Sequence, residues 1–175
     1  MEYRKLAKTI IEPELFSHFI RHQKVTQCWR KVDENWQIQP VAFVEEWQEK
    51  EFQQLCFYLK QTIENNGVVL GAFDADKLKG FVSVEGQLFG SQNHYLELSS
   101  LHVSEDYRGQ HIGQLLFQHA AAFARTKKAN KLYISSHSAV ETYAFYSHLG
   151  CTDAVEVSAN HLIREPFDRQ LEYTL

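Results

Sequence analysis

The sequence predicts a single α/β domain built around a mixed β-sheet. Two short apolar runs, residues 68–73 and 78–84, lie on either side of a polar turn and predict an antiparallel hairpin. An expected strand at 95–103, a helix at 112–127 and a strand at 131–135 then follow one another. A crossover of this kind joins parallel strands with a right-handed connection. With 175 residues, no repeats and no linker, the whole chain forms one expected domain.

The amino-terminal part is expected to contain a strand, a helix and an irregular segment before a second helix. Residues 3–8 fit a short strand. Pro13, between two glutamates, marks a helix start, because the first turn tolerates proline and favours acidic side chains. Residues 24–44 mix strand-like and irregular patterns, and we expect variable structure there beside the core. Residues 47–65 return to helical spacing and end at an Asn-Asn-Gly stop.

The middle of the chain carries the loop and the helix of the crossover. Residues 90–93 are expected to form a loop that leads into the strand at 95–103. Helical spacing predicts that the helix at 112–127 presents to the core Ile112, Leu115, Leu116, His119, Ala122 and Phe123.

The carboxy-terminal part is expected to hold a last helix and two last strands. Residues 138–149 predict the helix, and Ser138 and Glu141 have the spacing of a capping box. Residues 155–157 and 170–175 supply the expected final strands. Strands near the end of a chain are able to pair between copies, so a homodimer stays open beside a monomer.

Composition excludes several classes of protein. The net charge of −4 gives no general attraction to nucleic acid or to an anionic membrane, and we expect neither as a partner. Cys28, Cys56 and Cys151 are odd in number and widely spaced, which argues against a disulfide framework. The nine histidines show no metal-ligand spacing, so no metal site is expected. Without a membrane-length apolar run or targeting signal, the expected location is the cytoplasm.

The stretch from Leu96 to Gln118 places a strand, a glycine-containing turn and a helix start in succession. The turn contains Arg108, Gly109 and Gly113. The N–H groups of a first helical turn have no partner inside the helix, and the helix dipole adds partial positive charge there. The sequence therefore predicts an anion-binding site at this junction.

Two motifs in this half of the chain resemble a known family. Residues 105–113, Glu-Asp-Tyr-Arg-Gly-Gln-His-Ile-Gly, resemble the acetyl-CoA signature of the GNAT superfamily of N-acetyltransferases. Its pattern is Arg or Gln, two residues, Gly, one residue, then Gly or Ala. Residues 143–151 resemble a later segment of the superfamily, in which an aromatic–tyrosine pair ends a helix shortly before a glycine. The motifs occur in the family's order, whereas the region before Trp47 matches no motif.

The resemblance implies both a fold and a co-substrate. The fold is a mixed, mostly antiparallel central sheet whose two central strands splay, with helices on both faces. The co-substrate is acetyl-CoA, held by main-chain groups along the strand and by backbone N–H groups of the turn. The residues that the resemblance assigns to its binding are Leu101, His102, Val103, Arg108, Gly109, Gln110, His111, Ile112, Gly113 and Gln114.

His111 departs from the signature, because it stands where the pattern usually has its middle glycine. A glycine there lets the backbone approach the pyrophosphate without an intervening side chain. His111 therefore either points outward and leaves the amides available, or weakens binding. A helix start without any ligand is the structural alternative.

Tyr146 and Glu97 are the candidate catalytic residues. Tyr146 stands where the resemblance places a tyrosine that protonates the departing thiolate, and packing as a core aromatic is the alternative. Some superfamily members carry, at the place of Glu97, a glutamate that deprotonates the amine through water. Strict alternation would put Glu97, Ser99, Leu101 and Val103 on one face of the strand. The alternative for Glu97 is a solvent-exposed carboxylate.

The function that these features favour is acetylation of a primary amine of a small molecule by direct attack on acetyl-CoA. Two alternatives stay open. The chain could be a non-catalytic acyl-CoA-binding module, in which His111 marks a repurposed site, or an acetyltransferase acting on protein lysines or N-termini. The acidic pair Glu45 and Glu46 either attracts an amine or is exposed charge.

Overall fold

A seven-stranded sheet forms the centre of the computed structural model, which describes residues 1–92 and 94–175. Asn93, at the end of the predicted loop 90–93, lies outside these described residues. The strands lie in the spatial order β1 (Glu2–Lys5), β4 (Val68–Asp74), β5 (Lys77–Val84), β6 (Tyr95–Val103), β7 (Lys131–Ser136), β9 (Arg169–Thr174) and β8 (Thr152–Asp153).

The sheet is mixed and mostly antiparallel, as predicted. Within the described chain, β6 and β7 are the parallel neighbours, and the other adjacent strands pair antiparallel. Helix α2 (Ile112–Thr126) connects β6 to β7, so the predicted crossover is confirmed. The predicted hairpin is also confirmed, because β4 and β5 pair from Val68↔Val84 to Asp74↔Lys77.

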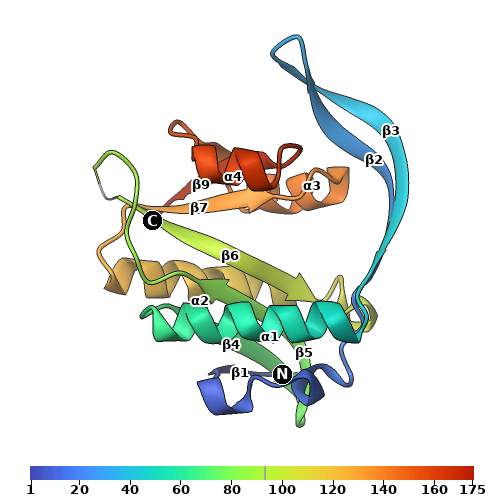
Figure 1. Ribbon diagram of the computed structural model, residues 1–175, viewed down its shortest axis with the longest axis vertical. Coiled ribbons are helices and arrows are strands. Elements are labelled where there is room, and N and C mark those ends of the chain that lie inside the picture. Colours follow the sequence, from blue (N-terminus) through green and yellow to red (C-terminus); the bar gives the residue numbers. More distant parts are fainter. Residues whose placement is uncertain (93) are drawn as a thin grey trace.

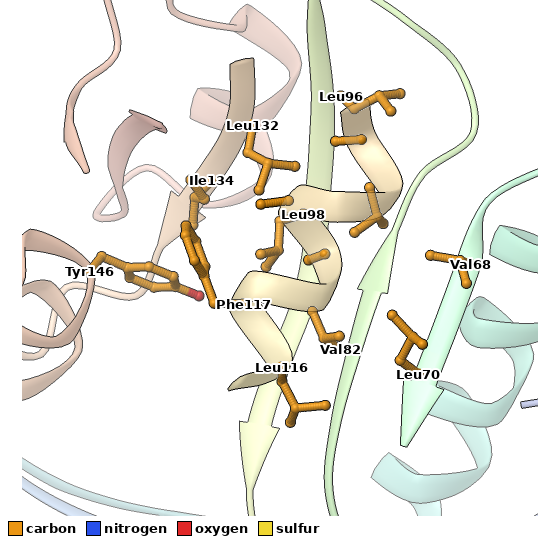
Figure 2. Packing of buried hydrophobic residues seen from close by; sticks show 14 of the residues in the cluster. Val68, Leu70, Val82, Leu96, Leu98, Leu116, Phe117, Leu132, Ile134 and Tyr146 are labelled. Atoms are coloured by element: carbon orange, nitrogen blue, oxygen red, sulfur yellow. The ribbon is translucent and has the colours of Figure 1, made fainter. Parts of the chain in front are cut away.

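Helices cover both faces of the sheet, and each face has its own apolar core. On one face, Leu116 and Phe117 of α2 belong to the same buried cluster as Val82 and Leu98 (Figure 2). On the other face, α1 (Glu49–Glu64) packs through side chains such as Leu59 into a second cluster. Full burial of one such side chain contributes about 1.5–3 kcal/mol. The two cores fix α1 and α2 on opposite sides of the central strands (Figure 1).

Residues 24–44, for which we expected variable structure, form most of a regular hairpin. Strands β2 (His22–Val32) and β3 (Asn35–Glu46) pair along their length as a separate two-stranded sheet. Asp33 and Glu34 form the turn with φ of 46° and 63°, the left-handed values that a tight hairpin turn requires. The hairpin reaches away from the central sheet (Figure 1). In the sequence the polar run at Asp33 and Glu34 and the proline at position 40 had interrupted the strand pattern, and the structure places the first at the hairpin turn and Pro40 inside β3.

The remaining short elements correct several expectations. The predicted helix after Pro13 is only a 3-10 turn, η2 (Pro13–Phe16), preceded by η1 (Lys8–Ile10). Residues 155–157 are not a strand, and the chain instead forms α4 (Ala159–Arg164). A third 3-10 turn, η3 (Glu105–Tyr107), follows β6.

The predicted capping box is absent from α3 (Val140–His148). The N-cap residue is Ala139, and it makes no side-chain cap hydrogen bond. The Ser138 hydroxyl instead accepts a hydrogen bond from Arg30 Nη1 at 2.7 Å. The main-chain carbonyl of Ser138 accepts a second one, from the Trp29 N–H at 2.8 Å. Ser138 therefore anchors β2 to the segment before α3.

The buried face of α2 is rotated from the predicted one. Leu115, His119 and Ala122 were expected in the core, but they are exposed. The buried side chains include Leu116, Phe117, Ala120, Ala121 and Ala124. Small alanines let the helix axis approach the sheet closely, and this close contact selects the face that helical spacing alone misplaced.

We expect Ala120→Leu to destabilise the protein and Ala122→Leu to leave its stability nearly unchanged. Ala120 is fully buried, so added methylenes would overpack the core and cost about 1–3 kcal/mol. Ala122 is exposed on the same helix, and its change should stay within about 0.5 kcal/mol. Urea denaturation of both variants measures the difference. Equal losses would show that the described face of α2 is wrong.

Candidate active site

The two parallel central strands diverge soon after they begin. Strand β6 pairs with β7 through Tyr95↔Lys131, Leu96↔Leu132 and Glu97↔Tyr133, and no further pairing between them is present in the described sheet. On its other edge β6 stays paired with β5 as far as Val103. The β7-facing edge of β6 is therefore unpaired with another strand beyond Glu97, and at its far end the Val103 carbonyl accepts a hydrogen bond from Arg108 Nε at 3.4 Å.

A cavity of about 1160 Å³ opens beside this free edge. Residues 98–103 of β6 line it on one side. The turn after β6, the start of α2 and Tyr146 of α3 line it as well. The divergence of the strands is visible in Figure 1, where β6 and β7 separate toward α3 and the base of the hairpin. The cavity thus joins a free strand edge to a helix N-terminus.

The N-terminus of α2 presents unpartnered amides to this cavity. The first intrahelical bond runs from the Leu115 N–H to the His111 carbonyl at 3.1 Å. The N-cap makes no side-chain hydrogen bond, so nothing in the described chain caps the amides of Ile112, Gly113 and Gln114. These N–H groups and the helix dipole favour an anion, as the sequence predicted.

Two glycines shape this turn in different ways. Gly109 has a φ of 75°, a left-handed value, and an added Cβ would meet no atom within 4 Å. It therefore keeps the turn open to a ligand. Gly113 lies against its neighbours, because a Cβ there would lie 3.2 Å from the Phe145 ring and 3.6 Å from Val103. Gly113 thus lets α2 start close to β6 and α3.

His111 takes the left-handed conformation that a glycine would adopt easily, with a φ of 59°. Its side chain is exposed, and its Nδ1 lies 3.3 Å from Gln114 Oε1. Of the two alternatives from the sequence, this arrangement fits the outward one. The strained backbone costs about 1–2 kcal/mol relative to an ordinary conformation.

Arg108 and His102 have side-chain contacts with the protein itself. Arg108 Nη2 donates to the His22 carbonyl at 2.7 Å, which ties the start of β2 to the turn. The His102 ring packs 4.7 Å from the Trp47 ring and 5.3 Å from the Phe81 ring. Desolvation and the nearby arginines lower the pKa of His102 to about 3, so its imidazole stays neutral. Both residues line the cavity.

A β-bulge overturns the expected facing of Glu97. Ser83 pairs with Ser100 while the next residue, Val84, pairs with Leu98, so Ser99 is the extra residue in β6. Leu101 belongs with Leu98 to the core beneath α2. Because facing alternates along a strand, Glu97 points to the opposite face, which α1 covers. Glu97 and Leu101 therefore do not share a face, contrary to strict alternation.

Tyr146 is a buried phenol at the edge of the cavity. Its ring lies 6.3 Å from the Phe117 ring and 5.1 Å from the Phe145 ring. Figure 2 shows it reaching from α3 toward Phe117 and Ile134. Burial, reinforced by the nearby Cys151 and Asp168, raises the pKa of Tyr146, so the phenol keeps its proton at neutral pH.

Acidic and histidine side chains from distant segments gather at the same cavity, and the sequence had not linked them. Glu45, His137, Glu165 and Asp168 all line it. The Asp168 carboxylate accepts a hydrogen bond from Ser135 Oγ at 3.3 Å. Burial and the neighbouring Glu165 raise the pKa of Asp168 to about 7. These residues come from β3, from the end of β7 and from the segment after α4, and no local sequence pattern connects segments so far apart.

Salt bridges and packing hold part of this group in place. Arg21, which is buried, pairs with Glu45 across the base of the hairpin. The Arg21 guanidinium also lies 5.2 Å from the Trp47 ring centre. The Phe43 ring packs 5.8 Å from the His137 ring. Glu45, which we had weighed as exposed charge, is therefore a partly buried wall of the cavity.

The described part of the chain shows no cluster of three or more His, Cys, Asp or Glu side chains arranged to hold a metal ion. None of its helices is long and apolar enough to cross a bilayer. All three cysteines are free and buried. Burial raises the pKa of Cys56 to about 11 and that of Cys151 to about 12, so both remain protonated thiols.

Comparison with known proteins supports one family. A sequence profile of the Acetyltransferase (GNAT) family matches residues 32–151. A similar solved structure is nourseothricin acetyltransferase, with 17% identity, 98% of this chain and 95% of that chain covered and a TM-score of 0.67. Aminoglycoside 6'-acetyltransferase type Ii has 17% identity and a TM-score of 0.63, and the match covers 99% of this chain and 97% of that chain. PaiA N-acetyltransferase from Thermoplasma acidophilum, solved with coenzyme A, has 15% identity, 99% and 98% coverage and a TM-score of 0.59. At these identities the structural likeness shows the fold, and no curated protein matches the chain.

We expect His111→Gly to be more stable than His111→Ala by about 1 kcal/mol, because alanine pays the left-handed penalty and glycine does not. The matched control is Gln118, an exposed site inside α2, where alanine should be the more stable by a similar amount. Thermal or urea unfolding of the four variants tests this reversal. If alanine were the more stable residue at both positions, the left-handed conformation of His111 would be ruled out.

We expect Asp168→Asn to reduce the loss of stability between pH 5 and pH 8. The pKa of Asp168 is raised in the folded protein from its ordinary 3.8 to about 7. Its stabilising contribution is therefore full below pH 4 and is lost as the pH rises through 7. Asparagine does not titrate, so this part of the loss disappears. Urea denaturation at both pH values measures it, and Asp76→Asn at an exposed turn is the control. An unchanged slope in Asp168→Asn would contradict the raised pKa.

Proposed function

The chain belongs to the Acetyltransferase (GNAT) family, and on this basis we propose that it transfers the acetyl group of acetyl-CoA to a primary amine of a small molecule. One observation carries the proposal. A free strand edge and an uncapped helix N-terminus meet in one cavity, together with a buried phenol. An extended arm with amide groups, a pyrophosphate at one end and a thioester at the other fits this arrangement.

Acetyl-CoA would use the two main-chain surfaces in different ways. The amides of Gly109 to Gln114 would hold the pyrophosphate, because an anion gains hydrogen bonds and a favourable dipole there. The pantetheine arm would pair with the free edge of β6 near Leu101 and Val103, as an added strand does. Arg108 and His102 would shape the wall through the contacts described above. One relative in the structural comparison is named as a complex with coenzyme A, which supports this co-substrate.

Tyr146 would act as the general acid. The tetrahedral intermediate collapses by expelling a thiolate, which needs a proton, and a phenol that remains protonated can give one. Tyr146 lines the same cavity as the free edge of β6, so acid and thioester would share one space. Its burial among Phe117 and Phe145 would keep water away from the reacting atoms.

Glu97 would act as the base through water. It is the last residue of β6 that pairs with β7, so it stands at the apex of the cleft. Its side chain points to the α1 face, from which an acceptor could approach while acetyl-CoA lies along the strand edge. The bulge at Ser99 therefore changes which face Glu97 uses, and the proposed base would act from the acceptor side.

A small amine is favoured as the acceptor by the charge of the cavity. Glu165 would attract an ammonium group, and so would Asp168 once it is ionised, whereas the charge of Glu45 is already paired with Arg21. Two of the structural relatives are named for small-molecule acceptors, nourseothricin and an aminoglycoside. The non-catalytic binding module and the protein acetyltransferase remain the alternatives. The cytoplasmic location and the homodimer stay predictions.

Thermal-shift titration with acetyl-CoA, followed by thiol release on a panel of amines and lysine peptides, separates these functions. We expect stabilisation by acetyl-CoA and turnover on small amines. Stabilisation without turnover on any acceptor would favour the binding module, and turnover only on peptides would favour protein acetylation. No stabilisation at all would overturn the acetyl-CoA site.

We expect Tyr146→Phe to lower kcat by about 100-fold while leaving acetyl-CoA affinity within about threefold. The phenol acts only when the thiolate leaves, so its loss should not affect ground-state binding. Tyr143→Phe on the same helix is the matched control, because Tyr143 packs against Trp29 outside the cavity. Steady-state kinetics and the thermal shift measure the two quantities. A mutant with the wild-type kcat would remove Tyr146 from the mechanism.

A further inference from the structure

Glu97 is held by a histidine from a remote segment. His161 of α4 lies with its Nε2 2.8 Å from Glu97 Oε1, and 64 residues separate the two in the sequence. His161 is 6% exposed, and the Glu97 side chain is 22% exposed. A hydrogen bond between groups this well buried fixes the carboxylate in one orientation.

The second ring nitrogen of His161 has no partner within the described chain. Its Nδ1 is buried and makes no hydrogen bond. An unsatisfied buried polar atom costs about 1–3 kcal/mol, so proteins rarely keep one without a use for it. When Nε2–H donates to Glu97, Nδ1 carries the free lone pair and is able to accept a proton.

A cavity of about 600 Å³ lies against this pair. The polar residues that line it are Asn65, Glu85, Gln87, Glu97, Ser158, Asn160, His161 and Arg164. This volume and polarity suit several water molecules. Glu97 and His161 line this smaller cavity and are not among the residues that line the larger one beside Tyr146, so water would have to carry a proton from the amine to Glu97.

Packing by Tyr133 and a hydrogen bond to its hydroxyl hold the Glu97–His161 pair in position. The Tyr133 ring packs 5.2 Å from the His161 ring, and the Tyr133 hydroxyl accepts a hydrogen bond from the Ser158 N–H at 2.9 Å. Tyr133 is the residue of β7 that pairs with Glu97. The apex of the cleft, the start of α4 and the carboxylate therefore form one rigid unit.

We propose that Glu97 and His161 act together to deprotonate the acceptor, with Glu97 as the catalytic base and His161 as its positioning residue. This inference rests on the function proposed above and deepens it. The ammonium group gives one proton, through water, to the pair, and this proton then leaves to the solvent. The free amine attacks the thioester carbon, and the carbon–sulfur bond breaks. Tyr146 gives its proton to the thiolate, and the proton lost from nitrogen as the amide forms restores the phenol.

The other charged groups near Glu97 and His161 either have hydrogen-bond partners of their own or lie elsewhere. Glu85 accepts hydrogen bonds from Thr62 and Ser99 and is already engaged. Arg164 also lines the small cavity. Asp168 lies in the larger cavity near Tyr146 and is the rival base.

The test compares two acceptors of the same shape that differ in basicity. The first is the best alkylamine of the panel, R–CH2–NH2, which is an ammonium ion at neutral pH. The second is its alkoxyamine analogue, R–O–NH2, which is already neutral and needs no base. Thiol release is measured with both on the full-length protein, and acetyl-CoA thermal shifts confirm that each variant folds and binds.

We expect Glu97→Gln and His161→Ala to lower kcat/KM for the alkylamine by about 100-fold. Both variants should stay within about threefold of wild type on the alkoxyamine. His161→Gln should recover most of the loss, because its amide N–H can hold Glu97 as the imidazole does. His119→Gln, an exposed histidine on α2, is the control for losing an imidazole elsewhere.

Equal losses on both acceptors would show that the pair is only structural and would overturn the proposal. An alkylamine-selective loss in Asp168→Asn, and not in Glu97→Gln, would assign the base to Asp168 instead. If His161→Ala does not fold, the isosteric Glu97→Gln and the conservative His161→Gln still test whether the pair deprotonates the alkylamine. Wild-type protein without turnover on either acceptor would count against the proposed function itself.

Discussion

The early divergence of β6 from β7 is the constraint on which the rest of the site depends. Parallel strands normally satisfy each other's main-chain groups along their length, and here the pairing stops at Glu97↔Tyr133. The groups beyond that point need a partner, which water or an extended ligand can supply. The outer pairs keep the sheet intact, since β5 holds β6 and β9 holds β7. The opening is thus stabilised by its flanks.

Helix α2 places a helix N-terminus at one end of this opening, so the two ends of the opening differ. Its alanines and Gly113 let it lie close to β6 and α3, so its uncapped N-terminus ends beside the free strand edge. An anion is favoured at that end, and an extended chain is favoured along the edge. His111 adopts a left-handed backbone at the junction, which is a local energetic cost at the start of α2.

The proposed acceptor side is assembled from segments that lie far apart in the chain. The base of the β2–β3 hairpin brings Arg21 and Glu45 to the cavity, and the segment after α4 brings Asp168. Helix α4 brings His161 to Glu97 at the apex. Each contribution depends on packing of its own element, such as the Trp29 and Ser138 contacts that dock the hairpin. Variation in these segments could change the acceptor while the strand edge and the helix N-terminus stay the same.

Local patterns in the sequence predicted the β4–β5 hairpin, the parallel pairing across the crossover, the α1 and α2 helices and a helix start whose amides could hold an anion. These features depend on neighbours in the chain: turn residues, helical spacing and the free amides of a first turn. The resemblance of the two motifs added the splayed strands and the family. Tertiary structure alone decided that Glu97 faces α1, because a single extra residue at Ser99 reverses the alternation. It alone brought His161 to Glu97, 64 residues away in the sequence, and Asp168 to the cavity that Tyr146 lines, because these side chains meet only once the sheet and the segments around α4 have packed.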